Sequence, residues 1–299
     1  MSPPNSVAVG ARLLLGAVVA LSVGCSPART SPAPSPSDRA ALLRLAAEAQ
    51  DADYRGDLAR LRSVFQEIAP YAGVPELARA ARQWRGFAMW RRALNATNDG
   101  SPADSIDRDL ASAVEEYRSA LAIDSSYVEA RIGLAASLMN RAYFARRDTA
   151  RAGAYLREVV PLLRALRRDA PENPRLLFVY GAQYYWTPPA RGGSREGAIA
   201  LLEEHLRAGR REPPPSDPLE PQWGEAELHM ILAFFISNLT SPDLDAAERH
   251  ARAALAAVPH WHYVRDVLLP QIQRQRGTRG GGDASARRRP GSATTVGAR

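Results

Sequence analysis

The stretch Asp109–Leu138, DLASAVEEYRSALAIDSSYVEARIGLAASL, decides how this chain folds. Apolar residues recur at three- and four-residue spacing on both sides of Asp124, which predicts two amphipathic helices joined by a tight turn. In the first helix, Ala113 and Ala120 lie one turn either side of Tyr117, so neighbouring backbones can approach while the ring fills the gap. A lone helical hairpin cannot bury both apolar faces, and we therefore expect further hairpins to stack against it.

This small–large–small spacing resembles the second helix of a tetratricopeptide repeat (TPR), although Ser125 stands where that family usually has proline. Residues 176–184 are similar to a first helix of the repeat, and residues 247–259 are similar to another second helix. The resemblance implies an all-α superhelical array of antiparallel hairpins that serves as a scaffold. The residues of the opening stretch that match the repeat are Ala113, Tyr117, Ala120, Leu121, Ile123 and Asp124.

The composition also favours helices. The apolar residues are mostly Ala and Leu, and runs of β-branched residues typical of strands are nearly absent. We therefore predict a helical repeat domain over residues 38–273. The formal net charge is +7, but the Arg-rich segment 274–299 carries most of it and the rest of the chain is close to neutral. A body without a basic surplus does not suit nucleic-acid binding, so no nucleic-acid partner is expected.

The N-terminus has the pattern of a secretory signal. Arg12 precedes LLLGAVVALSVGC, whose apolar run is too short to span a bilayer as a stable anchor. Its end, residues 21–25 (LSVGC), resembles a bacterial lipobox, which implies a signal peptide over residues 1–24 and lipid attachment at Cys25. An ordinary signal peptide with an incidental cysteine and an uncleaved anchor are the alternatives.

The segments at both ends of the helical body are predicted to lack a fold. Residues 25–37 are rich in Pro and Ser, which suits an extended tether between a lipid and the first helix. Residues 274–299 are rich in Gly and Arg and predict a disordered tail. These features together predict a lipid-anchored protein of the bacterial cell envelope, on the periplasmic side. Ser26 is not the aspartate of an inner-membrane retention signal, so outer-membrane placement is permitted.

No sequence pattern points to catalysis. Cys25 is the single cysteine, which excludes a multi-cysteine metal site, and the five histidines lack an HExxH spacing. The chain also lacks a GxSxG elbow, a GxGxxG loop and a GxxxxGK[ST] loop. We therefore predict a non-enzymatic protein with no cofactor and no metal.

Proline marks the places where the repeat pattern fails. Pro161 lies inside a long predicted helix and should kink or split it. Residues 186–194 (WTPPARGGS) form a loop longer than a repeat turn requires. This loop either contacts a ligand or is a structural crossover whose glycines permit positive φ. Residues 211–221 (REPPPSDPLEP) are interpreted as a connector between hairpins.

The predicted function is a non-catalytic scaffold that binds a protein or peptide along the groove lined by the first helices. The alternative is a small-molecule-binding accessory lipoprotein of a transport system, which requires a closed apolar pocket roofed by residues 186–193. The sequence leaves the oligomeric state open. The candidate groove and loop residues are Arg131, Tyr180, Gln183, Tyr184, Trp186, Arg191 and Glu227.

Overall fold

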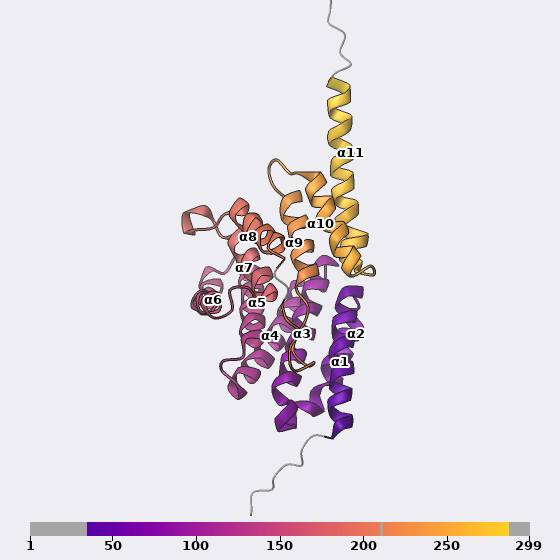
Figure 1. The fold of residues 1–299 in the computed structure, drawn as a ribbon. Helices are drawn as coiled ribbons and strands as arrows, with labels where there is room; N and C mark the ends of the chain where they lie inside the picture. Colours follow the sequence, from indigo (N-terminus) through magenta and orange to yellow (C-terminus); the bar gives the residue numbers. More distant parts are fainter. Residues whose placement is uncertain (1–34, 210–211, 287–299) are drawn as a thin grey trace, which may run out of the picture. The chain divides into compact units, whose positions relative to one another are not determined.

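The computed structural model describes residues 35–209 and 212–286, with side chains as far as residue 278. This part of the chain consists of α-helices and short 3-10 or π-helical turns without any strand, so the all-α prediction is confirmed (Figure 1). None of its helices is both long enough and apolar enough to cross a membrane. The predicted signal peptide, Cys25 and most of the tether lie outside the described residues.

Most of the helices are joined by short connections, and a longer segment joins α8 to α9. A 3-10 turn, Ala69–Gly73, follows the second helix, another at Pro189–Arg191 follows the seventh, and a π-helical turn, Tyr263–Leu268, leads into the last. The α-helices are α1 Pro36–Arg55, α2 Leu58–Glu67, α3 Pro75–Asn98, α4 Ala103–Ile123, α5 Val128–Phe144, α6 Thr149–Asp169, α7 Pro174–Trp186, α8 Arg195–Arg207, α9 Glu225–Ser237, α10 Leu244–Ala257 and α11 Leu269–Ala286.

Consecutive helices pack as five pairs, namely α1 with α2, α3 with α4, α5 with α6, α7 with α8, and α9 with α10. The first helix of each pair also contacts the first helix of the next pair, from α1 through α3, α5 and α7 to α9. One apolar cluster of buried side chains runs through all of these pairs. The helix–turn–helix predicted for residues 109–138 is confirmed as α4 and α5.

Tyr117 of α4 accounts for the close packing around this hairpin. Its ring is 1% exposed and lies between α3 and α5. A Cβ atom added to Gly133 of α5 would stand 2.1 Å from the ring, and one added to Gly86 of α3 would stand 2.8 Å from it. The predicted large side chain in a gap between close backbones is therefore present, and glycines of two neighbouring helices create much of that gap.

Pro161 lies inside α6, which is one helix, so the proline does not split it. Two helix boundaries differ from expectation. Helix α1 begins at Pro36, inside the predicted tether, because Ser35 caps it by accepting a 3.1 Å hydrogen bond from the Asp38 N–H. Helix α11 continues to Ala286, whereas composition predicted a disordered tail from residue 274. Each residue added to an existing helix adds one backbone hydrogen bond, so a helix started by packed residues can extend into a weakly helical segment.

Candidate functional site

Residues 212–224, between α8 and α9, form an extended segment that we call the strap. It contains a single turn and no helix. Leu219, Pro221 and Trp223 are buried, whereas the intervening Glu220 is half-buried and Gln222 is exposed. Alternate side chains therefore point into the protein, as they do in an extended strand.

The strap lies across the first helices of three pairs (Figure 1). The Trp84 Nε1–H on α3 donates a 2.8 Å hydrogen bond to the Leu219 carbonyl. The Glu220 carboxylate accepts from Arg79 of α3 at 2.6 Å and from the hydroxyl of Tyr127, the residue before α5, at 2.7 Å. Earlier in the strap, Asp217 pairs with Arg39 of α1 at 2.5 Å.

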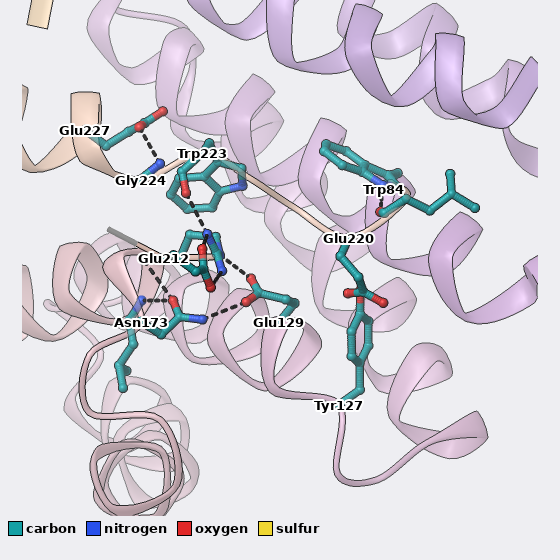
Figure 2. A network of polar contacts seen from close by, with 12 residues as sticks. Trp84, Tyr127, Glu129, Asn173, Glu212, Glu220, Trp223, Gly224 and Glu227 are labelled. Carbon is teal, nitrogen blue, oxygen red and sulfur yellow. Dashed lines mark hydrogen bonds and ion pairs between the residues drawn. The ribbon is translucent and has the colours of Figure 1, made fainter. Parts of the chain in front are cut away.

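A single guanidinium holds both ends of the strap. Arg175 of α7 donates two hydrogen bonds to the Glu212 carboxylate, at 2.7 and 2.6 Å, and one of 2.8 Å to the Trp223 carbonyl. Figure 2 shows Glu212 and Trp223, at opposite ends of the strap, close to each other, and Glu220 beside Tyr127. Bidentate pairing of arginine with a carboxylate is among the stronger polar contacts in proteins, so residues 212–223 form a loop closed at Arg175.

Two further side chains orient Arg175. Glu129 of α5 accepts from its Nε–H at 2.7 Å and from the Asn173 amide at 2.8 Å. Asn173 in turn caps α7, because its side-chain oxygen accepts from the N–H groups of Arg175 and Leu176. Burial raises the pKa of the Glu129 carboxyl, and the adjacent Arg175 charge opposes that rise.

The Trp223 ring belongs to a buried aromatic cluster. Its centroid lies 5.9 Å from Phe87, 5.8 Å from Trp90 and 6.2 Å from Phe178. The Arg91 guanidinium lies 5.4 Å from the Trp223 centroid. The C-terminal end of the strap is thus part of the hydrophobic core, to which Leu219 from its middle also belongs.

Glu227 and Arg91 form a second buried network beside the strap. Arg91 is 3% exposed and donates a 2.6 Å hydrogen bond to Asp53 of α1. Glu227 lies 3.9 Å from Arg91 and accepts 2.8 Å hydrogen bonds from the Tyr54 hydroxyl and the Gly224 N–H. Burial raises the pKa of Glu227, and Arg91 opposes that rise. Because Glu227 is 1% exposed, it lies in the core and not on a surface open to a partner.

Four of the other candidate residues belong to α7. Tyr180 and Tyr184 stack with ring centroids 6.0 Å apart, and the Gln183 amide donates to the Thr187 hydroxyl at 2.7 Å. Trp186 is 58% exposed, and its ring contacts Tyr185 and Phe234. No hydrogen bond or ring contact of the described side chains joins Trp186 to the other three, so they do not form one site.

The remaining two candidates differ in their surroundings. Arg131 of α5 pairs with Asp169 at 2.9 Å, and its side chain is only 14% exposed. Arg191 is exposed on the loop that follows α7. Neither residue contacts the strap through a described polar interaction.

The loop at residues 186–194 depends on its glycines. Gly192 has a φ of 87°, and a Cβ atom on Gly193 would stand 1.7 Å from the Thr187 carbonyl oxygen. The Ser194 side chain caps α8 by accepting from the Gly197 N–H at 2.9 Å. Surface depressions of about 360, 490, 140 and 380 Å³ occur among the described residues, and residues 186–194 line none of these four.

The described residues contain no group of three or more His, Cys, Asp or Glu side chains placed to hold a metal ion. Comparison with known proteins found no matching family model, no matching curated protein and no matching solved structure.

Sequence reasoning missed the residues that make the strap. The signal that was present is the acidic, proline-rich composition of residues 211–221, followed at once by Trp223. Solvated connectors do not usually carry a Leu and a Trp close together, since both are commonly buried. Their positions indicate an extended segment that packs against something, although they do not identify the surface.

Proposed function

We propose that this chain is a non-catalytic, TPR-like scaffold that binds an extended segment of another protein. The strap is the observation that carries the proposal, because side chains on or next to α1, α3, α5 and α7 together hold a non-helical peptide segment, which has a turn at residues 217–220. In a TPR-like superhelix the first helices line the inner groove. The face under the strap corresponds to that groove.

The chemistry of this face suits peptide recognition. An extended segment exposes carbonyl groups along its backbone and presents alternate side chains to the surface beneath it. Trp84 and Arg175 each donate to a strap carbonyl, while Arg79 binds a strap carboxylate. These donors stand on helices held by the common core, and such preorganisation lowers the cost of binding.

The buried ionisable groups support binding without turnover. Glu129 and Glu227 have raised pKa values, which is often a property of catalytic carboxyls. Each is nevertheless buried and paired with an arginine, Arg175 and Arg91 respectively, and neither lines any of the four surface depressions. Their shifts therefore fit a structural role.

We further propose that the scaffold is held in the bacterial cell envelope by a lipid on Cys25. The support for this part comes from the sequence, in the apolar run that ends at residue 25 and the Pro/Ser-rich segment that follows. A tether of that composition is extended and solvated, which would let the helical domain reach a partner away from the membrane surface.

Native mass spectrometry of the protein purified from membranes tests the proposal. The expected result is a complex whose added mass dissociates as a peptide or protein. A bound small molecule in its place would contradict the scaffold and favour an accessory lipoprotein of a transport system. A chain that carries no bound protein or peptide under any condition of growth would also count against the proposal.

A further inference from the structure

The strap covers the face that the proposed function needs. The Trp84 Nε1–H is already bonded to the Leu219 carbonyl, and Arg79 and Tyr127 are already bonded to Glu220. Another segment cannot reach these donors while the strap is in place. The proposed function therefore requires that part of the strap leave, or that a partner bind elsewhere.

The contacts of the strap divide it into fixed ends and a weakly held middle. Glu212 and the Trp223 carbonyl are bound by Arg175, whose side chain is 2% exposed, and the Trp223 ring is packed in the core. Next to Trp223, Gly224 has a φ of 142°, and a Cβ atom there would stand 2.8 Å from Pro174. This end can leave only if the core opens.

The middle, residues 213–222, is held by side chains of the helices: Trp84 donates to the Leu219 carbonyl, and Arg39, Arg79 and Tyr127 bind its carboxylates. Its ion pairs are partly exposed: the side chains are 42% and 33% exposed in Arg39–Asp217, and 31% and 21% exposed in Arg79–Glu220. Exposed ion pairs contribute little to stability. Among the described residues, no backbone–backbone hydrogen bond joins this middle part to a helix. Leu219 and Pro221 are its buried side chains, so an opening confined to the middle takes two side chains out of the core and leaves the Trp223 ring in place.

We propose that residues 213–222 are an internal occupant of the peptide-binding face, released while Arg175 keeps both ends of the strap in place. The partner that fits the vacated face is an extended acidic segment of another protein that carries a leucine next to proline and glutamate, as Pro218-Leu219-Glu220-Pro221 does. Arg39 and Arg79 supply the complementary charge. The inference rests on the proposed function, because it identifies the chemistry of the segment to be bound.

Thiol labelling of a buried position in the strap tests the opening. In the full-length chain with Cys25→Ser, Leu219→Cys is compared with Leu202→Cys of α8, since both leucines are almost completely buried. We expect the thiol at position 219 to react at least about tenfold faster in native buffer, with a weak dependence on urea, because it becomes accessible by local opening. Equal rates with the same steep urea dependence would show that the strap opens only with the whole protein and would overturn the inference.

A peptide with the sequence of residues 215–222, PSDPLEPQ, labelled with fluorescein, tests the recognition. Its affinity is measured by fluorescence anisotropy for the wild type and for the Leu219→Ala variant, in which the strap should be open more often. We expect binding to the variant to be at least about tenfold tighter, because the competent state is more populated. The control peptide PSNPLQPQ should bind at least about tenfold more weakly.

A Leu219→Ala variant with a wild-type circular dichroism spectrum and no affinity for the peptide would overturn the inference. If that variant fails to fold, the labelling rates at positions 219 and 202 still decide whether the strap opens. Different results would contradict the strap proposal and the scaffold proposal. Labelling only through global unfolding would leave the scaffold proposal intact, with its partner at another surface. A native protein without bound protein or peptide would overturn the scaffold proposal whatever the strap does.

Discussion

At the scale of single residues, Tyr117 and Arg175 stabilise the protein in different ways. Tyr117 fills a gap between backbones, so its contribution comes from shape and burial. Arg175 joins three carboxylate or carbonyl groups from separate parts of the chain, so its contribution comes from paired charge. Substitutions at or next to these two residues should therefore lower the free energy of unfolding for different physical reasons.

The first prediction concerns Gly133. Alanine at this position would place its Cβ 2.1 Å from the Tyr117 ring, which is buried and has no room to move away. Gly133→Ala should lower the free energy of unfolding by about 3 kcal/mol, as overpacked cores do. Gly153→Ala is the control, since its nearest new contact is 3.5 Å away, on the flexible Arg157 side chain of the same helix. It should be neutral or stabilising by about 0.5–1 kcal/mol. Urea denaturation of both variants measures the difference, and equal midpoints would contradict the prediction.

Arg175→Met tests whether Arg175 holds the two ends of the strap. The substitution removes the charge and leaves Glu129 buried without its cationic partner. We expect the free energy of unfolding to fall by about 3–5 kcal/mol, the cost of an uncompensated buried charge. Arg118→Met is the matched control, because Arg118 and Glu158 form an ion pair at 55% and 40% side-chain exposure. Its loss should cost less than about 1 kcal/mol. Addition of Glu129→Gln should recover part of the stability. The absence of any recovery would contradict the stabilising role of the Arg175–Glu129 pair.

At the scale of elements, the pairing of helices follows from local pattern. The apolar stripes on both sides of Asp124 predicted α4 and α5, and the side chains of Asn173 and Ser194 cap α7 and α8. The strap behaves differently, because an extended segment has no local hydrogen-bond pattern and takes its conformation from the surface it covers. Two helices also share a contact that depends on pH.

That contact joins α9 and α10. The Nδ1 atoms of His229 and His250 lie 2.9 Å apart. Burial lowers the pKa of both imidazoles, and the neighbouring His229 and Arg249 charges help to lower that of His250 from 6.5 to about 4. Between these two values the unfolded chain binds a proton that the folded protein does not bind. Stability should therefore fall as the pH decreases from about 6.5 to about 4.

His250→Gln should reduce this pH dependence, since the variant has no imidazole to protonate at that position. The nearby Glu225 carboxylate also acts on the pair, since it partly opposes the lowering of the His229 pKa by burial. The measurement is the urea midpoint at pH 7 and at pH 5 for the wild type and the variant. A variant that loses as much stability as the wild type between these two values would show that other groups cause the loss.

At the scale of the whole molecule, the helical domain and its attachment are separate questions. If Cys25 carries a lipid, Cys25→Ser should move the protein from the membrane fraction to the soluble fraction without altering its helical circular dichroism spectrum. Cell fractionation followed by immunoblotting measures the distribution. A variant that remains in the membrane fraction would contradict lipid anchoring and favour an uncleaved anchor or attachment through a partner.

The helices of the whole molecule could be predicted from the sequence, but the surroundings of the candidate residues could not. Helices could be predicted because their hydrogen bonds join residues four apart, so that composition and spacing carry the information. For the candidate site, helix position was not sufficient. Glu227 was placed on a groove from its helix position, yet it lies in the core, because the aromatic and charged groups that bury it come from α1, α3 and the strap.

By itself, the sequence determined an all-helical chain of paired helices, with α4 and α5 at its most regular point. Only the tertiary structure decided that residues 212–224 lie across the first helices and close on Arg175. The physical reason is the distance along the chain over which each contact acts. A helix is specified by neighbours within a few residues, while Glu220 and Arg79 are 141 residues apart and meet only after the helices have packed.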